Sequence, residues 1–227
     1  MARGIVSTIR PGVLCVLAAV TAAGVPAPAQ DLTFTDITKE AGAGGPAAPG
    51  KTGGHGAMFA DVDGDGLPDL YFTMIFEGPM ADLFFHNLGG GRFVEEGARR
   101  GVADYDGGSP GAVFADLDND GDFDLVFAGD SKVYRNDGAG NFLPYSHVPV
   151  EGINDPRSIA FADIDADGDP DFAVACKRSG NRLVRNDWNS GNWVEVKLVS
   201  PRGQAGAFGA KVRVFTTGEE PRLIGWR

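Results

Sequence analysis

The strongest constraint on the fold of this 227-residue chain is a segment that occurs three times. Residues 56–72, 111–127 and 158–174 align without gaps, and each holds a short apolar run, an acidic stretch and a second apolar run. The first aspartates of the acidic stretches, Asp61, Asp116 and Asp163, are 55 and 47 residues apart. A period of this length is typical of repeat proteins in which each unit is one supersecondary structure.

Each repeat predicts a set of antiparallel strands. The two apolar runs are rich in Val, Ile, Phe and Tyr and are bounded by Gly, Asn and Asp, which favours strands. Two more strands are expected around a Gly- or Asn-rich turn, as in "KVYRNDGAGNF", where the aromatic is expected in the blade core. Only "TKEAGA" and "VEEGARRG" are expected to hold a helical turn. The sequence therefore predicts an all-β fold of about three four-stranded β-propeller-type blades, an incomplete propeller, followed by a partial β domain.

The acidic stretches share one pattern when each is numbered from its first aspartate. Positions 1, 3, 5 and 9 are Asp in all three, position 6 is Gly, and position 7 varies, so that it is expected to offer its backbone carbonyl. The predicted metal ligands are Asp61, Asp63, Asp65, Leu67 and Asp69 in the first loop, Asp116, Asp118, Asp120, Asp122 and Asp124 in the second, and Asp163, Asp165, Asp167, Asp169 and Asp171 in the third. The Asp122 side chain itself is expected to face solvent.

The pattern predicts about three Ca²⁺ sites. Ca²⁺ takes six to eight oxygen ligands, and Gly at position 6 allows the left-handed turn that wraps the chain around the ion. Mg²⁺ is a weaker candidate because it keeps its waters, and Zn²⁺ or Cu²⁺ prefer His or Cys, which the loops lack. The alternative to a metal site is an Asp-rich turn whose side chains bond only to its own backbone. The EF-hand does not fit, because position 12 is Phe72, Phe127 or Val174 in place of Glu.

The first 29 residues are predicted to be a secretory signal peptide. Arg3 and Arg10 precede an apolar stretch that is too short to span a membrane, and Ala27-Pro28-Ala29 fits a cleavage site. Removing this segment changes the formal charge from −11 to −13, which argues against a nucleic-acid partner. Only one cysteine remains, so no intramolecular disulfide is possible. The stability of the fold must then come from core packing, from bound metal, or from both.

These loops resemble the FG-GAP/VCBS-type calcium-loop repeat, over most of residues 31–190. The opening "FTDITKEAG" and the turn "RNDGAGNF" look like the cartilage acidic protein-like subset, and "NWVEVKLVSPRGQAGAFGAKVRVFTTG" is similar to the start of an ASPIC/UnbV domain. After the predicted signal peptide at 1–29, the resemblance implies two regions: repeat blades at 30–190 and a truncated ASPIC/UnbV-like domain at 191–227. Three calcium loops are fewer than a closed propeller needs, so we expect missing C-terminal blades or self-association through open sheet edges.

The expected function is that of a secreted module, extracellular or periplasmic, which binds a protein partner and contains structural Ca²⁺. A carbohydrate-recognising accessory module is the alternative, with Trp188 and Trp193 as its candidate patch. Catalysis is not expected, because no nucleophile, metalloprotease or phosphate-binding motif occurs in the sequence. His86 takes the place that Arg135 and Arg185 have before a shared Asn, and is expected to form part of a turn.

Overall fold

The computed structural model describes residues 33–45, 52–76, 81–103, 110–128, 132–147, 153–187, 213–215 and 223–226. The chain divides into two compact units, one of residues Asp36–Ser190 and one that combines Met1–Thr35 with Gly191–Arg227. In the second unit, β12 (Arg213–Phe215) and β13 (Leu223–Trp226) form an antiparallel pair. The predicted signal peptide and both tryptophans of the candidate carbohydrate patch lie outside the described residues.

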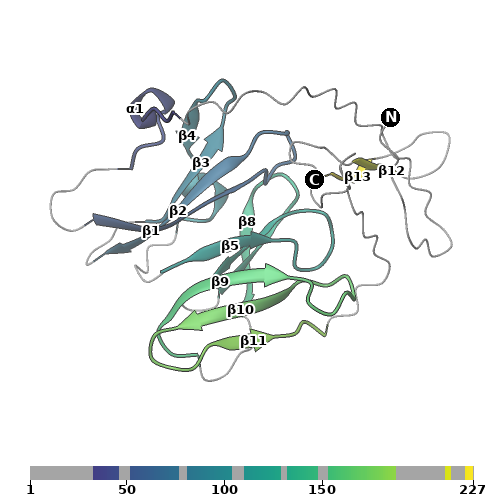
Figure 1. Ribbon diagram of the computed structural model, residues 1–227. Coiled ribbons are helices and arrows are strands. Elements are labelled where there is room, and N and C mark those ends of the chain that lie inside the picture. Colours follow the sequence, from purple (N-terminus) through teal and green to yellow (C-terminus); the bar gives the residue numbers. More distant parts are fainter. Residues whose placement is uncertain are drawn as a thin grey trace. The chain divides into compact units, whose positions relative to one another are not determined.

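Three antiparallel sheets, here called blades 1 to 3, follow one another along the larger unit (Figure 1). Within each sheet, strands that are consecutive in the chain are hydrogen-bonded neighbours. Blade 1 consists of β1 (Thr52–Ala60), β2 (Asp69–Phe76), β3 (Leu83–Asn87) and β4 (Phe93–Glu95). Blade 2 consists of β5 (Ala112–Ala115), β6 (Asp124–Phe127), β7 (Lys132–Asn136) and β8 (Phe142–His147). Blade 3 consists, in its described part, of β9 (Pro156–Ala162), β10 (Asp171–Cys176) and β11 (Arg182–Val184).

The predicted all-β class is confirmed. The described part of the chain contains only two short helices, α1 (Thr38–Ala41) and α2 (Gly97–Arg100), which lie in the two segments expected to hold a helical turn. The described residues form three blades, whereas closed propellers have about four to eight. Among the same residues, no helix is long and apolar enough to cross a membrane.

The blades pack face to face through two apolar clusters. The first joins blades 1 and 2 and includes Tyr71 and Phe84 from blade 1 with Leu125, Phe127 and Phe142 from blade 2. Phe142, predicted as a core aromatic, is only 2% exposed. The second cluster joins blades 2 and 3 and includes Val126, Val133, Ile159, Phe172 and Val174. All four residues of β6 are buried. Leu125 and Phe127 pack in the first cluster and Val126 in the second, because alternate side chains of a strand point to opposite faces of its sheet.

The three acidic loops occupy equivalent places in the blades. Each joins the first strand of a blade to the second, and its ninth residue is the first residue of that second strand. The first strands of successive blades are also neighbours, because β5 lies in contact with both β1 and β9. The fold therefore repeats one strand–loop–strand unit in three successive blades.

Candidate metal centres

The aspartate at position 9 anchors each loop to its blade. In blade 1, Asp69 Oδ2 accepts a hydrogen bond from the Val62 backbone N–H at 3.3 Å, and its Oδ1 accepts one from the Asn87 N–H at 2.8 Å. Asp124 and Asp171 accept the same two bonds in blades 2 and 3. The three carboxylates are 0–2% exposed. A buried carboxylate thus ties the start of each loop to the end of the third strand or the residues just after it.

The aspartates at positions 1 and 5 shape the turn itself. The backbone N–H of Gly66 donates to Asp61 Oδ2 at 2.9 Å, and the N–H of Leu67 donates to Asp65 Oδ1 at 2.7 Å. Blades 2 and 3 repeat both bonds at 3.0–3.2 Å. The glycines at position 6 have φ of 91°, 98° and 97°, the left-handed conformation that glycine adopts without strain. These bonds leave the side chains at positions 1, 3 and 5 on one side of a tight turn.

The structure brings most of the predicted side-chain ligands together. Carboxylate oxygens at positions 1, 3 and 5 lie within 4.8 Å of one another in the first two loops, namely Asp61, Asp63 and Asp65, and Asp116, Asp118 and Asp120. In the third loop the group consists of positions 1, 3 and 9, namely Asp163, Asp165 and Asp171. Asp167 and Asp124 are not members of these groups. Metal binding by the position-7 backbone carbonyls stays a prediction for Leu67, Asp122 and Asp169.

Position 7 is more enclosed than the sequence indicated. The prediction that Asp122 faces solvent is wrong: its side chain is half-buried, and a Cβ placed on Gly138 would lie 2.6 Å from Asp122 Oδ2. Asp169 is only 3% exposed and accepts a hydrogen bond from Asn119 Nδ2 at 2.8 Å. The cause in both cases is a neighbouring turn or loop that packs against this position.

The chemistry of the first two loops fits a hard cation. Asp61 Oδ1, Asp63 Oδ1 and Asp118 Oδ1 are buried oxygens without a hydrogen-bond partner among the described residues. A buried anionic oxygen without a partner is costly unless a cation offsets its charge. Burial, together with the charges of Asp65, Asp63 and Asp69, raises the pKa of Asp61 although Gly66 donates a hydrogen bond to it. The oxygen-only donor set of the loops is the set that Ca²⁺ prefers.

Burial raises the pKa of Asp124 to about 6, and the charge of the nearby Asp118 adds to the increase. An unfolded aspartate has a pKa of about 4, so between these values the folded chain holds a proton that the unfolded chain releases. The free energy of unfolding of the metal-free protein should therefore fall as pH rises through this window, by up to about 3 kcal/mol.

Urea denaturation of the metal-free protein at about pH 4.5 and about pH 6.5 measures this change. Asp124→Asn is the matched variant, because it removes the ionisable group and keeps the shape of the side chain. We expect the variant to lose stability less steeply over this pH range. An equally steep loss in wild type and variant would contradict the assignment to Asp124.

A basic side chain faces each loop from the position before the shared Asn. Arg135 pairs with Asp118 and, at 3.1 Å, with Asp120; Arg185 Nε lies 3.9 Å from Asp165 Oδ2. In blade 1 this position is His86, whose Nδ1 lies 3.0 Å from Asp69 Oδ1. The prediction that His86 forms part of a turn is wrong, because it belongs to β3 and contacts the acidic loop. The recurrence of a basic residue before the same Asn was the signal in the sequence.

Sequence reasoning also missed the contacts between neighbouring blades at these loops. Asn136 of blade 2 donates through Nδ2 to the Val62 carbonyl of the first loop at 2.7 Å. Asn119 of the second loop donates to the Gly168 carbonyl of the third at 3.1 Å. Asn136 Oδ1 also accepts from Gly138 N–H, as expected of a turn former. The acidic loops are therefore part of the blade interfaces as well as of single blades.

Arg100 connects the first loop to blade 2. This residue ends α2, is 5% exposed, and donates to Asp63 Oδ2 at 3.2 Å, to the Ala139 carbonyl at 2.7 Å and to Glu96 Oε2 at 3.0 Å. Its guanidinium carbon lies 5.7 Å from the centre of the Phe84 ring. One buried guanidinium thus donates hydrogen bonds to oxygens of the first acidic loop, of the residue that precedes α2, and of the turn between β7 and β8.

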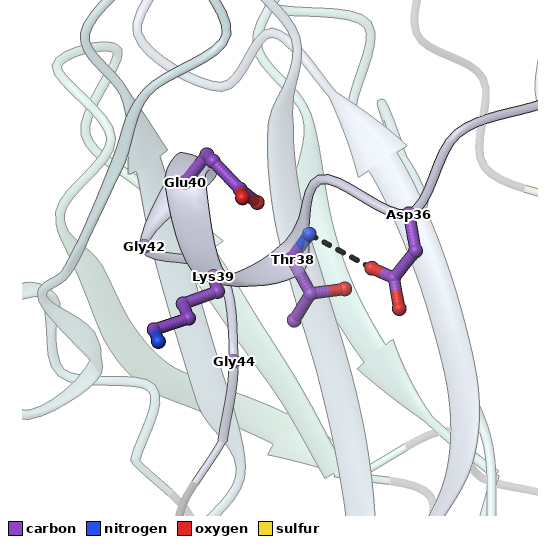
Figure 2. Close-up of a pocket in the computed structure, with 6 residues that line it drawn as sticks. All are labelled: Asp36, Thr38, Lys39, Glu40, Gly42 and Gly44. Carbon is purple, nitrogen blue, oxygen red and sulfur yellow. Dashed lines mark hydrogen bonds between the residues drawn. The ribbon is translucent and has the colours of Figure 1, made fainter.

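A separate pocket lies at α1 and is lined by Asp36, Thr38, Lys39, Glu40, Gly42 and Gly44. Figure 2 shows the Asp36 carboxylate accepting a hydrogen bond from the Thr38 backbone N–H, at 3.0 Å. This bond lowers the pKa of Asp36. Asp36 is thereby engaged with its own turn, and the pocket contains none of the predicted metal ligands.

Comparison with known proteins identifies the repeat. No curated protein matches the chain. A family model described as FG-GAP-like repeat matches residues 61–127 and again residues 124–174. The first match begins at the first aspartate of loop 1 and the second ends in β10, so together they span all three acidic loops and half of the chain. The chain therefore belongs to the family of proteins with FG-GAP-like repeats.

Proposed function

We propose that this protein is a secreted calcium-binding module of the β-propeller type, which binds a protein partner and contains structural Ca²⁺. The observation that carries the calcium proposal is the convergence of three carboxylates in each loop, with buried oxygens at Asp61, Asp63 and Asp118 that have no hydrogen-bond partner among the described residues. Ca²⁺ would be held by the aspartates at positions 1, 3, 5 and 9 and by the backbone carbonyl at position 7 of each loop. When bound, it would neutralise carboxylates that otherwise repel one another across the turn.

The structural role follows from what the loops connect. Each loop joins two core strands, and the first and second loops also bond to the next blade. An ion that holds a loop in shape would therefore stabilise both a hairpin and a blade interface. With a single cysteine in the mature chain, no disulfide can do this instead. Extracellular Ca²⁺ at millimolar levels would fill sites with dissociation constants of about 10⁻⁴–10⁻³ M.

Support for a binding role comes from the outer strands. Leu143 and Tyr145 lie two positions apart on β8 and are 68% and 61% exposed, and exposed apolar side chains that lie close together favour protein contact. Leu183 on β11 is also 68% exposed. The proposal assigns no catalytic step to the loops, because carboxylates around Ca²⁺ are held ionised whereas glycosidase chemistry needs one protonated carboxyl. We also propose that residues 1–29 are a signal peptide, on the basis of their residue pattern. Residues 191–227 are proposed to be part of an ASPIC/UnbV-like domain, on the basis of sequence resemblance.

Calorimetric titration of the purified protein with Ca²⁺ tests the proposal. We expect about three bound ions and a melting temperature that rises with Ca²⁺ by roughly 5–15 °C, because each site adds about 1–2 kcal/mol when Ca²⁺ exceeds the dissociation constant about tenfold. Asp118→Asn should remove one ion, and Glu40→Gln on α1 should remove none although it also deletes one negative charge. A melting curve that is the same in EDTA and in Ca²⁺ would refute a structural role.

A further inference from the structure

Blade 1 differs from the other blades in the residue that faces its acidic loop. Blades 2 and 3 place Arg135 and Arg185 before the shared Asn, and blade 1 places His86 there. A guanidinium is always protonated and has no lone pair for a metal. A neutral imidazole offers one ring nitrogen, which is the commonest protein ligand for transition metals. Only the first loop therefore has a nitrogen donor at this position.

Three potential ligand atoms converge at this place. His86 Nδ1 lies 3.0 Å from Asp69 Oδ1 and 3.4 Å from Asp63 Oδ2, and one potential ligand atom from each of the three residues lies within 4.8 Å of the other two. Ligands bound to Zn²⁺ at about 2.0–2.2 Å in a tetrahedron stand roughly 3.3–3.6 Å apart, so the observed spacing needs little change. The side chains are 18%, 1% and 14% exposed for His86, Asp69 and Asp63. The site is shielded from water and is already close to the required geometry.

The groups around the three ligands would hold them in place. Asp69 accepts backbone N–H bonds from Val62 and Asn87, which fix its orientation. Arg100 holds Asp63 through Oδ2, while Asp63 Oδ1 is buried and has no hydrogen-bond partner among the described residues. Contacts of this kind behind the ligands are typical of protein metal sites. Arg100 contributes one positive charge next to Asp63, against the two negative charges that Asp63 and Asp69 bring to the site.

We propose that the first loop binds a divalent transition metal of the Zn²⁺ class through Asp63, Asp69 and His86, and that the other two loops do not. A set of one imidazole and two carboxylates suits Zn²⁺, whereas an all-oxygen set suits Ca²⁺. The inference extends the proposed calcium function, because Asp63 and Asp69 are also predicted calcium ligands of this loop. The two ions therefore exclude each other at loop 1, and the protein binds Zn²⁺ at one place and Ca²⁺ at the other two.

The first test uses Zn²⁺ alone on protein freed of metals by a chelating resin. Calorimetry should give one tightly bound Zn²⁺, and Co²⁺ in its place should give the visible absorption of a four- or five-coordinate site. His86→Arg introduces the residue that blades 2 and 3 contain, and should abolish Zn²⁺ binding; His86→Gln should do the same if the arginine disturbs folding. A double variant His55→Asn/His147→Asn, which removes the other histidines, should bind Zn²⁺ as the wild type does.

Competition between the two metals separates this inference from the calcium proposal. One equivalent of Zn²⁺ should lower the number of bound Ca²⁺ from about three to about two in the wild type, and should change nothing in His86→Arg. Zn²⁺ binding that survives both His86 variants, or no Zn²⁺ binding at all, overturns the inference. Zn²⁺ binding that depends on His86 in a protein that binds no Ca²⁺ would support the inference and refute the proposed calcium function.

Discussion

Replacement of Arg100 by alanine is expected to lower the free energy of unfolding by about 3–5 kcal/mol. The guanidinium is buried between blades 1 and 2 and donates to Asp63, Ala139 and Glu96. Its removal would leave the Asp63 carboxylate buried without a cationic neighbour on α2, and would open a gap over Phe84. Loss of one partner of a buried ion pair costs this much because the remaining charge stays desolvated.

Arg99→Ala is the matched control for this prediction. Arg99 lies on the same helical turn, has the same charge and also pairs with Glu96, but its side chain is 63% exposed. An exposed pair contributes only about 0–1 kcal/mol, so the control should change stability little. Urea denaturation of the metal-free protein measures both variants, because bound Ca²⁺ would itself offset the charge of Asp63. Equal losses would show that the charge of α2, and not the buried position of Arg100, stabilises the interface.

Gly101→Ala is expected to destabilise the protein by about 3–4 kcal/mol, from backbone strain and steric overlap together. Gly101 follows α2 with φ of 81°, a conformation in which a Cβ is strained. A Cβ at this position would also lie 2.4 Å from the carbonyl oxygen of Phe142 in β8. Because that atom belongs to the backbone of β8 at its buried residue Phe142, α2 and β8 would have to move apart to relieve the overlap.

Gly90→Ala isolates the contribution of backbone strain. Gly90 lies in the turn between β3 and β4 with φ of 64°, and a Cβ there would meet no atom within 4 Å. This control should lower the free energy of unfolding by only about 1–2 kcal/mol, because alanine is strained in the left-handed conformation. Thermal or urea denaturation of the two variants gives the difference, which measures how tightly α2 packs against β8. A control that is as unstable as Gly101→Ala would remove the evidence for close packing.

Much of each blade could be predicted from the sequence because its determinants are local. The strands beside each loop are short apolar runs bounded by turn-forming residues, and the two helical turns occurred in the segments "TKEAGA" and "VEEGARRG" that were expected to hold them. Three of the four aspartates in each loop converge because their spacing in the turn is fixed by nearby backbone bonds. The turn bonds of Asn87 and Asn136 to the following glycines were also predictable from residue type.

The contacts that make each loop different could not be predicted in this way. Arg100 reaches Asp63 across 37 residues of sequence and Ala139 across 39, and Asn136 reaches the Val62 carbonyl across 74. Such contacts depend on how one blade lies against the next. The same cause explains why Asp122 is half-buried and why His86 faces the first loop instead of forming a turn.

By itself the sequence determined the repeated strand–loop–strand unit, since alternating aspartates, a glycine at position 6 and flanking β-branched or aromatic residues act within about a dozen positions of one another. Only the tertiary structure decided which basic side chains contact each loop, because these contacts depend on the pairing of the third strand with the second and on the packing of neighbouring blades. The four loop aspartates are alike in the three repeats, and their surroundings are not. The electrostatic differences between the three sites therefore arise from residues distant in the chain.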